Sequence, residues 1–66
     1  MQILLNGESR EVPRQIFLTE LLVMFDLPQQ RVAVELNRAV IRRAEWETTV
    51  IANDDRIEVI HFVGGG

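Results

Sequence analysis

Short apolar runs separated by turn residues open the chain. The apolar run 3–5 precedes Asn6-Gly7, and Asn-Gly is a strong hairpin signal because a type I′ turn needs a positive φ at both central positions. The return strand is expected over residues 9–12. Pro13 ends it, since proline has no N–H to donate to a neighbouring strand. The chain is therefore predicted to begin with a β-hairpin.

The next apolar residues follow a helical period. They fall at positions i, i+3, i+4 and i+7, which form one face of a helix: Leu18, Leu21, Leu22 and Phe25. Pro28 lies just beyond the end of this helix. Val23 and Met24 lie outside the apolar face, so they either widen the buried side of the helix or form an exposed apolar patch. Ordinary burial preferences favour the first interpretation.

The second half of the chain returns to a strand pattern. Residues 32–36 alternate between apolar and mixed positions, which predicts a strand. Asn37-Arg38 predicts a tight turn into a short strand at residues 40–41. A single irregular helical turn is expected at residues 44–46. Residues 52–55 are rich in side chains that bond their own backbone and predict another turn.

The last strand, residues 56–63, is mostly apolar on both faces. Ile57, Val59 and His61 alternate with Glu58, Ile60 and Phe62. This pattern suits a central strand that a helix covers on one side and that is partly exposed on the other. The predicted fold is α+β, a mixed sheet of four to five strands packed on one main helix. Residues 1–63 are expected to form this domain, followed by a flexible glycine tail, residues 64–66.

Composition limits the kinds of protein that fit. The chain has 66 residues, 47% of them hydrophobic, and contains no cysteine, so disulfides, cysteine metal sites and cysteine nucleophiles are excluded. No window approaches the roughly 18 apolar residues of a membrane span, and the N-terminus lacks a basic lead. We expect a single soluble, cytoplasmic domain that is a monomer when free and has no membrane partner.

The charge pattern favours a protein partner. The net charge is −3 and all seven basic residues are arginine, with no basic stripe of the kind that neutralises phosphates, which argues against nucleic acid. The absence of lysine also leaves no side-chain amine that could accept an acyl group.

An ordinary enzyme or metal site is hard to assemble from these residues. His61 lacks an orienting carboxylate and a nucleophile, so it is interpreted as a half-buried structural histidine or as part of a partner interface. Asp54-Asp55 lacks further ligands and fits turn chemistry better than a metal site. Trp46 is expected to fill the core with its N–H bonded to backbone, although a binding anchor is the alternative. Arg42-Arg43 fits a solvated edge or a surface that steers an acidic partner.

The remaining candidate is the terminal carboxylate on Gly64-Gly65-Gly66. Glycine has no Cβ, so such a tail fits a slot that is too narrow for side chains. A carboxylate is a poor electrophile until its oxygen becomes part of a good leaving group. Attack by Gly66 on the α-phosphate of ATP would supply one, and a sulfur donor could convert the acyl-adenylate into a thiocarboxylate.

The strand order and the tail together resemble the ubiquitin-like β-grasp sulfur carriers, and most closely the ThiS family of thiamine biosynthesis. The resemblance covers essentially the whole chain. Its most specific segments are residues 1–7, 19–22, 31–37, 43–46 and 55–61, the last leading into Gly65-Gly66. Two positions depart from the family pattern. Asp54 stands where Gly is frequent, and Phe17 stands at the helix start where Thr is common; each affects local energetics by about 1 kcal/mol.

The resemblance implies a carrier protein, not an enzyme, that binds no cofactor and no metal. An E1-like adenylyltransferase would use ATP to adenylate Gly66, a sulfur-donating enzyme would form the thiocarboxylate, and thiazole synthase would receive the sulfur. The residues implied in partner binding are Gly65, Gly64, Val63, Phe62 and Ile60. The alternatives are a molybdopterin-synthase small subunit and a ubiquitin-like module that only binds partners or is joined to protein amines. The sulfur donor and the stoichiometry with partners stay open.

Overall fold

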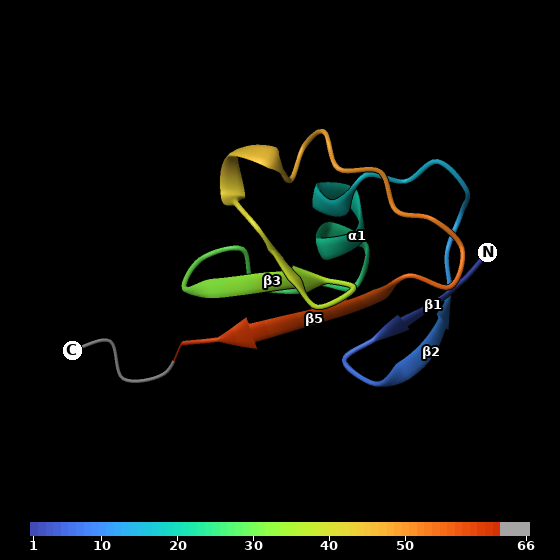
Figure 1. Ribbon diagram of the computed structural model, residues 1–66, viewed down its shortest axis with the longest axis horizontal. Coiled ribbons are helices and arrows are strands. Elements are labelled where there is room, and N and C mark those ends of the chain that lie inside the picture. The colour runs from blue at the N-terminus through green and yellow to red at the C-terminus, as the bar shows by residue number, and fades with distance from the viewer. Residues whose placement is uncertain (63–66) are drawn as a thin grey trace.

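The N-terminal hairpin forms where the Asn-Gly signal predicts it. In the computed structural model, which describes residues 1–62, β1 (Gln2–Leu5) pairs antiparallel with β2 (Glu8–Glu11) (Figure 1). Asn6 and Gly7 have φ angles of 50° and 82°. The return strand begins one residue earlier than expected because a two-residue turn places Glu8 directly opposite Leu5.

The main helix lies where the apolar period predicts it, but its buried side is narrower. In α1 (Leu18–Met24), the residues Leu18, Leu21 and Leu22 are fully buried. Val23 and Met24 are 63% and 46% exposed. The interpretation of these two residues as extra core is therefore wrong. The helix is only two turns long and rests on the sheet by one stripe, so the positions beside that stripe face outward.

A second hairpin follows the helix. β3 (Val32–Leu36) pairs with β4 (Ala39–Ile41), and Asn37 and Arg38 form the turn with φ angles of 52° and 73°. The expected irregular turn is a short 3-10 helix, η1 (Arg43–Glu45). Trp46 follows it and is buried, and its Nε1–H donates to the carbonyl of Ile41 at 2.9 Å. The prediction that Trp46 fills the core is confirmed.

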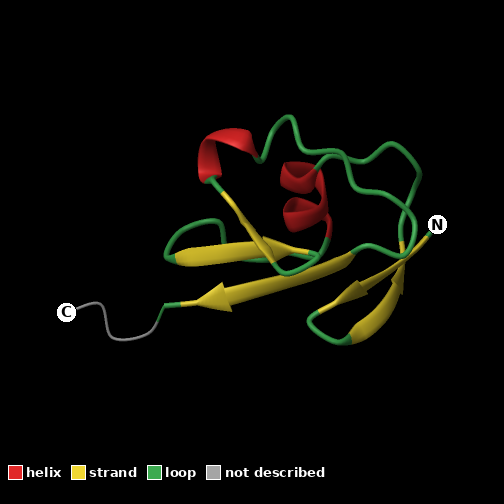
Figure 2. Ribbon diagram, in the orientation of Figure 1, coloured by secondary structure: helices red, strands yellow, loops and turns green. Residues whose placement is uncertain are grey.

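The last strand holds the two hairpins together. The sheet order is β2-β1-β5-β3-β4, and β5 (Arg56–His61) runs parallel to β1 and antiparallel to β3. The helix covers one face of this sheet (Figure 2), as the α+β prediction requires. The core between the layers is apolar and draws on every element except β2, β4 and η1: Ile3, Leu5, Val12, Ile16, Leu18, Leu21, Leu22, Val32, Val34, Trp46, Ile51 and Ile57. β5 ends at His61, two residues before the expected end. Val63 and the predicted boundary between residues 63 and 64 lie outside the described residues.

Candidate docking face of the sheet

Strand register divides the sheet into a helix-covered face and an open face. Leu5 lies opposite Ile57 across the β1–β5 pair, and both are buried. Side chains alternate between the two faces of a sheet, so Leu4 and its partner Arg56 belong to the open face. In the β3–β5 pair the open face takes Ala33 opposite Ile60, and Glu35 opposite Glu58.

The open face is apolar toward the C-terminal end of β5. Ile60 is 44% exposed, Phe62 is 55% exposed, and Val40, on the neighbouring hairpin, is 66% exposed. The backbone N–H of Phe62 donates to the carbonyl of Arg31 at 2.7 Å, which holds residue 62 beside the entry to β3. Exposed apolar side chains grouped on one face of a small domain are typical of protein contact sites.

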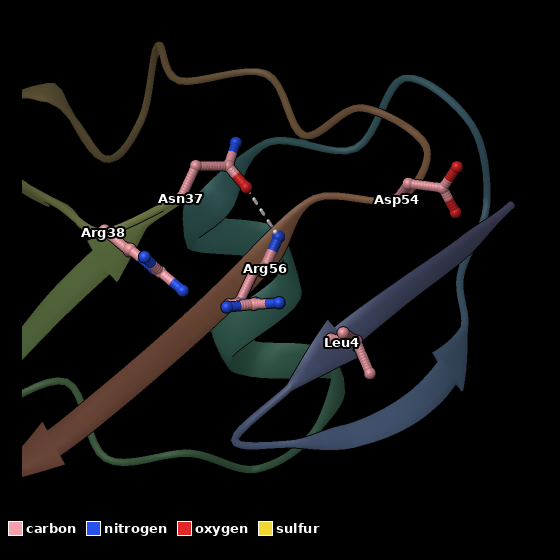
Figure 3. Close-up of a pocket in the computed structure, with 5 residues that line it drawn as sticks. All are labelled: Leu4, Asn37, Arg38, Asp54 and Arg56. Carbon is pink, nitrogen blue, oxygen red and sulfur yellow. Dashed lines mark hydrogen bonds between the residues drawn. The ribbon is translucent and has the colours of Figure 1, made fainter.

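Charged side chains lie on the same face beside the apolar group. Glu35 and Glu58 face each other directly across β3 and β5, an arrangement that is unfavourable for like charges unless a cation approaches. Farther toward the start of β5, the face has a hollow lined in part by Arg38 and Arg56 (Figure 3). None of these four residues was singled out from the sequence. Alternation assigns Glu35, Arg56 and Glu58 each to a face of its own strand, and Arg38 lies in the turn between β3 and β4, but the meeting of these residues depends on register between strands.

The predicted partner-binding residues divide into two groups. Ile60 and Phe62 lie exposed at the end of β5, where a docked protein could reach them. Val63, Gly64, Gly65 and Gly66 lie outside the described residues. The role of Ile60, Phe62, Val63, Gly64 and Gly65 in partner binding, and that of Gly66 as the reacting residue, stay predictions.

The structure also shows the surroundings of His61 and Arg43, two further residues that the sequence analysis considered. His61 is exposed, so its interpretation as a half-buried structural histidine is wrong; the strand ends at this residue, beyond the part of β5 that α1 covers. A role in a partner interface stays a prediction. Arg43 is more than a solvated edge, because its guanidinium lies 4.7 Å from the centre of the Trp46 ring and donates to the carbonyl of Gln29.

The paired aspartates serve the turn. The Asp55 carboxylate accepts from the backbone N–H of Ala52 at 2.7 Å and from Nδ2 of Asn37 at 3.0 Å. Within residues 1–62, no three His, Asp or Glu side chains gather as a metal site would require. The helices of this part of the chain are all too short to cross a membrane.

Comparisons with known proteins identify the fold and the family. A model of the ThiS family matches residues 3–66. The crystal structure of a thiamine biosynthesis protein, ThiS, from Geobacter metallireducens superposes with a TM-score of 0.88 at 33% identity and covers 100% of both chains. This likeness confirms the ubiquitin-like β-grasp fold.

Curated relatives occur both as small proteins and as parts of larger ones. The sulfur carrier protein ThiS of Escherichia coli (strain K12) is 27% identical over 100% of both chains. A protein named thiazole synthase from Magnetococcus marinus is 42% identical over all 66 residues, and the chain spans 20% of its length. By its fold and by its match over residues 3–66, the chain belongs to the ThiS family.

Proposed function

We propose that this protein carries sulfur for the thiazole moiety of thiamine. The family match, which includes the glycines at positions 64–66, carries this proposal. The relatives support it, since they include proteins named as sulfur carriers and thiazole synthases. The relatives named thiazole synthase favour thiazole formation over the molybdopterin-synthase alternative.

Gly66 is the proposed reacting residue. Its carboxylate oxygen attacks the α-phosphate of ATP, pyrophosphate leaves, and an acyl-adenylate forms. A donor carrying sulfur at the oxidation level of sulfide then attacks the acyl carbon, and AMP leaves. The product is a thiocarboxylate, whose sulfur is the nucleophile that thiazole synthase uses. Gly64 and Gly65 provide clearance, because a chain without Cβ atoms fits a narrow channel.

The proposed partners are an E1-like adenylyltransferase, a sulfur-donating enzyme and thiazole synthase. Ile60, Phe62 and Val40 form the apolar contact on the open face, and Val63, Gly64 and Gly65 lead the carboxylate into the partner. The thiazole synthase relatives favour this assignment for a physical reason. Joining a carrier-like segment to the rest of such a protein in one chain raises the effective concentration of the two parts.

The domain itself is proposed to act as a co-substrate and to bind no cofactor. ATP and the sulfur donor are bound by the partner enzymes.

Intact-protein mass spectrometry tests the proposal. After incubation with ATP, the cognate activating enzyme and a sulfur donor, the mass is expected to rise by the difference between sulfur and oxygen, with the change located on Gly66. A variant that lacks Gly65 and Gly66 is the matched control and should keep its mass. An unchanged mass for the intact chain under competent conditions would reject the carrier function, and an amide-linked adduct with a second protein would favour a protein modifier.

Deletion of the gene separates the two sulfur pathways. A thiamine requirement that a thiazole precursor relieves supports the proposal. Normal growth without thiamine, together with loss of molybdopterin, would favour the molybdopterin-synthase alternative.

A further inference from the structure

A hollow lies on the open face of the sheet near the start of β5, at the opposite end of the strand from Phe62. It encloses about 320 Å³ and is lined by Leu4, Asn37, Arg38, Asp54 and Arg56 (Figure 3). Leu4 and Arg56 are register partners across β1 and β5, and Arg38 comes from the turn between β3 and β4. Three segments that are distant in sequence therefore meet at this hollow.

The hollow holds two guanidinium groups that form no close ion pair within residues 1–62, although Glu58 follows Arg56 by two residues on the same face. Arg38 and Arg56 are both exposed, and Figure 3 shows their side chains extending toward the same space. Across residues 1–62 the only ion pair joins Arg10 and Glu8. The Asp54 carboxylate lines the other end of the hollow and points away from both arginines (Figure 3). Like charges gathered at one place are favourable only when an anion joins them.

Asn37 fixes the two arginines relative to each other. Its Oδ1 accepts from the backbone N–H of Arg56 at 2.9 Å, and its own N–H donates to the carbonyl of Arg56 at 2.7 Å. Its Nδ2 donates to Asp55. The turn that carries Arg38 is thus tied to the residue that carries the second guanidinium. One N–H of the Asn37 amide is used in this way, so most of the donors left for a ligand in the hollow belong to the two guanidinium groups.

The backbone at Arg38 is left-handed, as it also is at Gln15 and Arg31. Its φ of 73° resembles the 82° of Gly7, and each residue follows an asparagine in a hairpin turn. This conformation suits glycine and is unfavourable for arginine. The first hairpin turn has glycine at this position, whereas the second has arginine.

We propose that this hollow receives a carboxylate side chain of the protein that docks on the open face. The planar donor forks of two arginines match a carboxylate, which can accept two hydrogen bonds from each fork. The hollow is open and continuous with the docking face, as a site for a partner side chain must be. The identity of the docked protein as the activating enzyme rests on the proposed function; the anion site itself does not.

The hollow can be tested on the free protein by NMR. The Nε–H signals of the arginines are followed while a tetraglutamate peptide, or inorganic phosphate, is added at constant ionic strength. Saturable shifts at Arg38 and Arg56 with the peptide, and none at Arg14, support the proposal. Equal shifts at all three, or none, would overturn it. Saturation by phosphate at far lower concentration than by the peptide would also overturn it, because it would indicate a small-anion site.

Charge reversal tests the hollow in the docked state. Arg38→Glu and Arg56→Glu are each expected to lower kcat/KM for activation about tenfold, through KM, and the loss should shrink as salt rises. Arg14→Glu makes the same charge change in a loop outside the hollow and should keep the wild-type value. Arg56→Gln removes the positive charge without adding a negative one. If circular dichroism shows that a Glu variant is unfolded, the KM of Arg56→Gln tests the hollow instead.

The two experiments separate this inference from the proposed function. If the wild-type chain is never activated, the carrier function is rejected. The peptide titration still tests whether the hollow binds a carboxylate. If the wild type is activated and R38E, R56E and R14E all have the wild-type KM, the proposed carboxylate site is overturned and the carrier function is not.

Discussion

Two asparagines connect the hairpin turns to the central strand. Asn6 and Asn37 each occupy the first central position of a turn, with φ angles of 50° and 52°. Oδ1 of Asn6 accepts from the N–H of Val59 at 2.8 Å, and Oδ1 of Asn37 accepts from the N–H of Arg56 at 2.9 Å. Asparagine tolerates the left-handed conformation and also supplies an acceptor. Each turn thus fixes its hairpin against β5.

Replacing Arg38 by glycine is expected to stabilise the fold and to weaken docking. Removing the Cβ at a φ of 73° should raise the free energy of unfolding by about 1 kcal/mol. Urea denaturation measures this change. Gly7→Ala is the matched control. A Cβ at Gly7 would meet nothing within 4 Å, so only the strain of placing alanine at a positive φ should act, and it should lower the stability of this variant by about 1 kcal/mol. A less stable R38G variant would mean that the Arg38 side chain supports the fold.

At the scale of elements, β5 divides its side chains between the core and the docking face. Ile57 is fully buried against the helix layer, whereas Ile60, three residues later, is exposed on the open face. One strand therefore stabilises the domain with one set of side chains and exposes the other set on the face proposed for docking.

Alanine substitutions in β5 should separate these two roles. Ile57→Ala leaves a cavity and is expected to cost roughly 2 to 5 kcal/mol of stability. Ile60→Ala should cost less than about 1 kcal/mol, because its side chain already contacts water. The activating enzyme should show a raised KM with I60A, and the unfolding midpoint of I60A should fall much less than that of I57A. Equal losses of stability in the two variants would contradict the assignment of faces.

Local signals predicted most of the elements, because each depends on neighbouring residues. The Asn6-Gly7 turn and the i, i+3, i+4, i+7 face of α1 are both confirmed. The exposure of Val23 was not predicted, since it depends on which elements cover the helix from outside. The pairing of Glu35 with Glu58 and the meeting of Arg38 with Arg56 depend on register between distant strands, which no local pattern encodes.

The family departure at Asp54 also has a local cause. Its φ is 68°, a conformation that glycine adopts without strain and that aspartate tolerates better than most residues. The glycine that the resemblance implies at this position would fit the same backbone. The other departure, Phe17, begins α1 without a side-chain cap, and its N–H instead donates to Oε1 of Glu20 at 2.9 Å.

At the scale of the whole molecule, the core and the proposed reacting residue are separate. Every residue of the core cluster lies between Ile3 and Ile57, whereas the proposed chemistry takes place at Gly66. The domain can thus keep one fold while the glycines are processed by other proteins.

Deleting Gly65 and Gly66 should therefore abolish activation without changing the fold. The midpoint of thermal unfolding is expected to stay within about 1 °C of the full chain, because no core side chain is removed. Pyrophosphate release with ATP and the activating enzyme should fall to background. A lower unfolding midpoint would show that the glycines contribute to stability, and the loss of activity would then need a second explanation.

The position of β5 in the chain has a consequence for synthesis. The hairpins β1–β2 and β3–β4 are made first, yet in the sheet order they do not touch, because β5 lies between them. An isolated two-stranded hairpin is marginally stable in water. The sheet therefore closes only after residues 56–61 have been made, and Gly66 follows them. A translation product that stops before residue 56 lacks β5 and therefore has no closed sheet, and one that stops anywhere before residue 66 lacks the residue proposed to react.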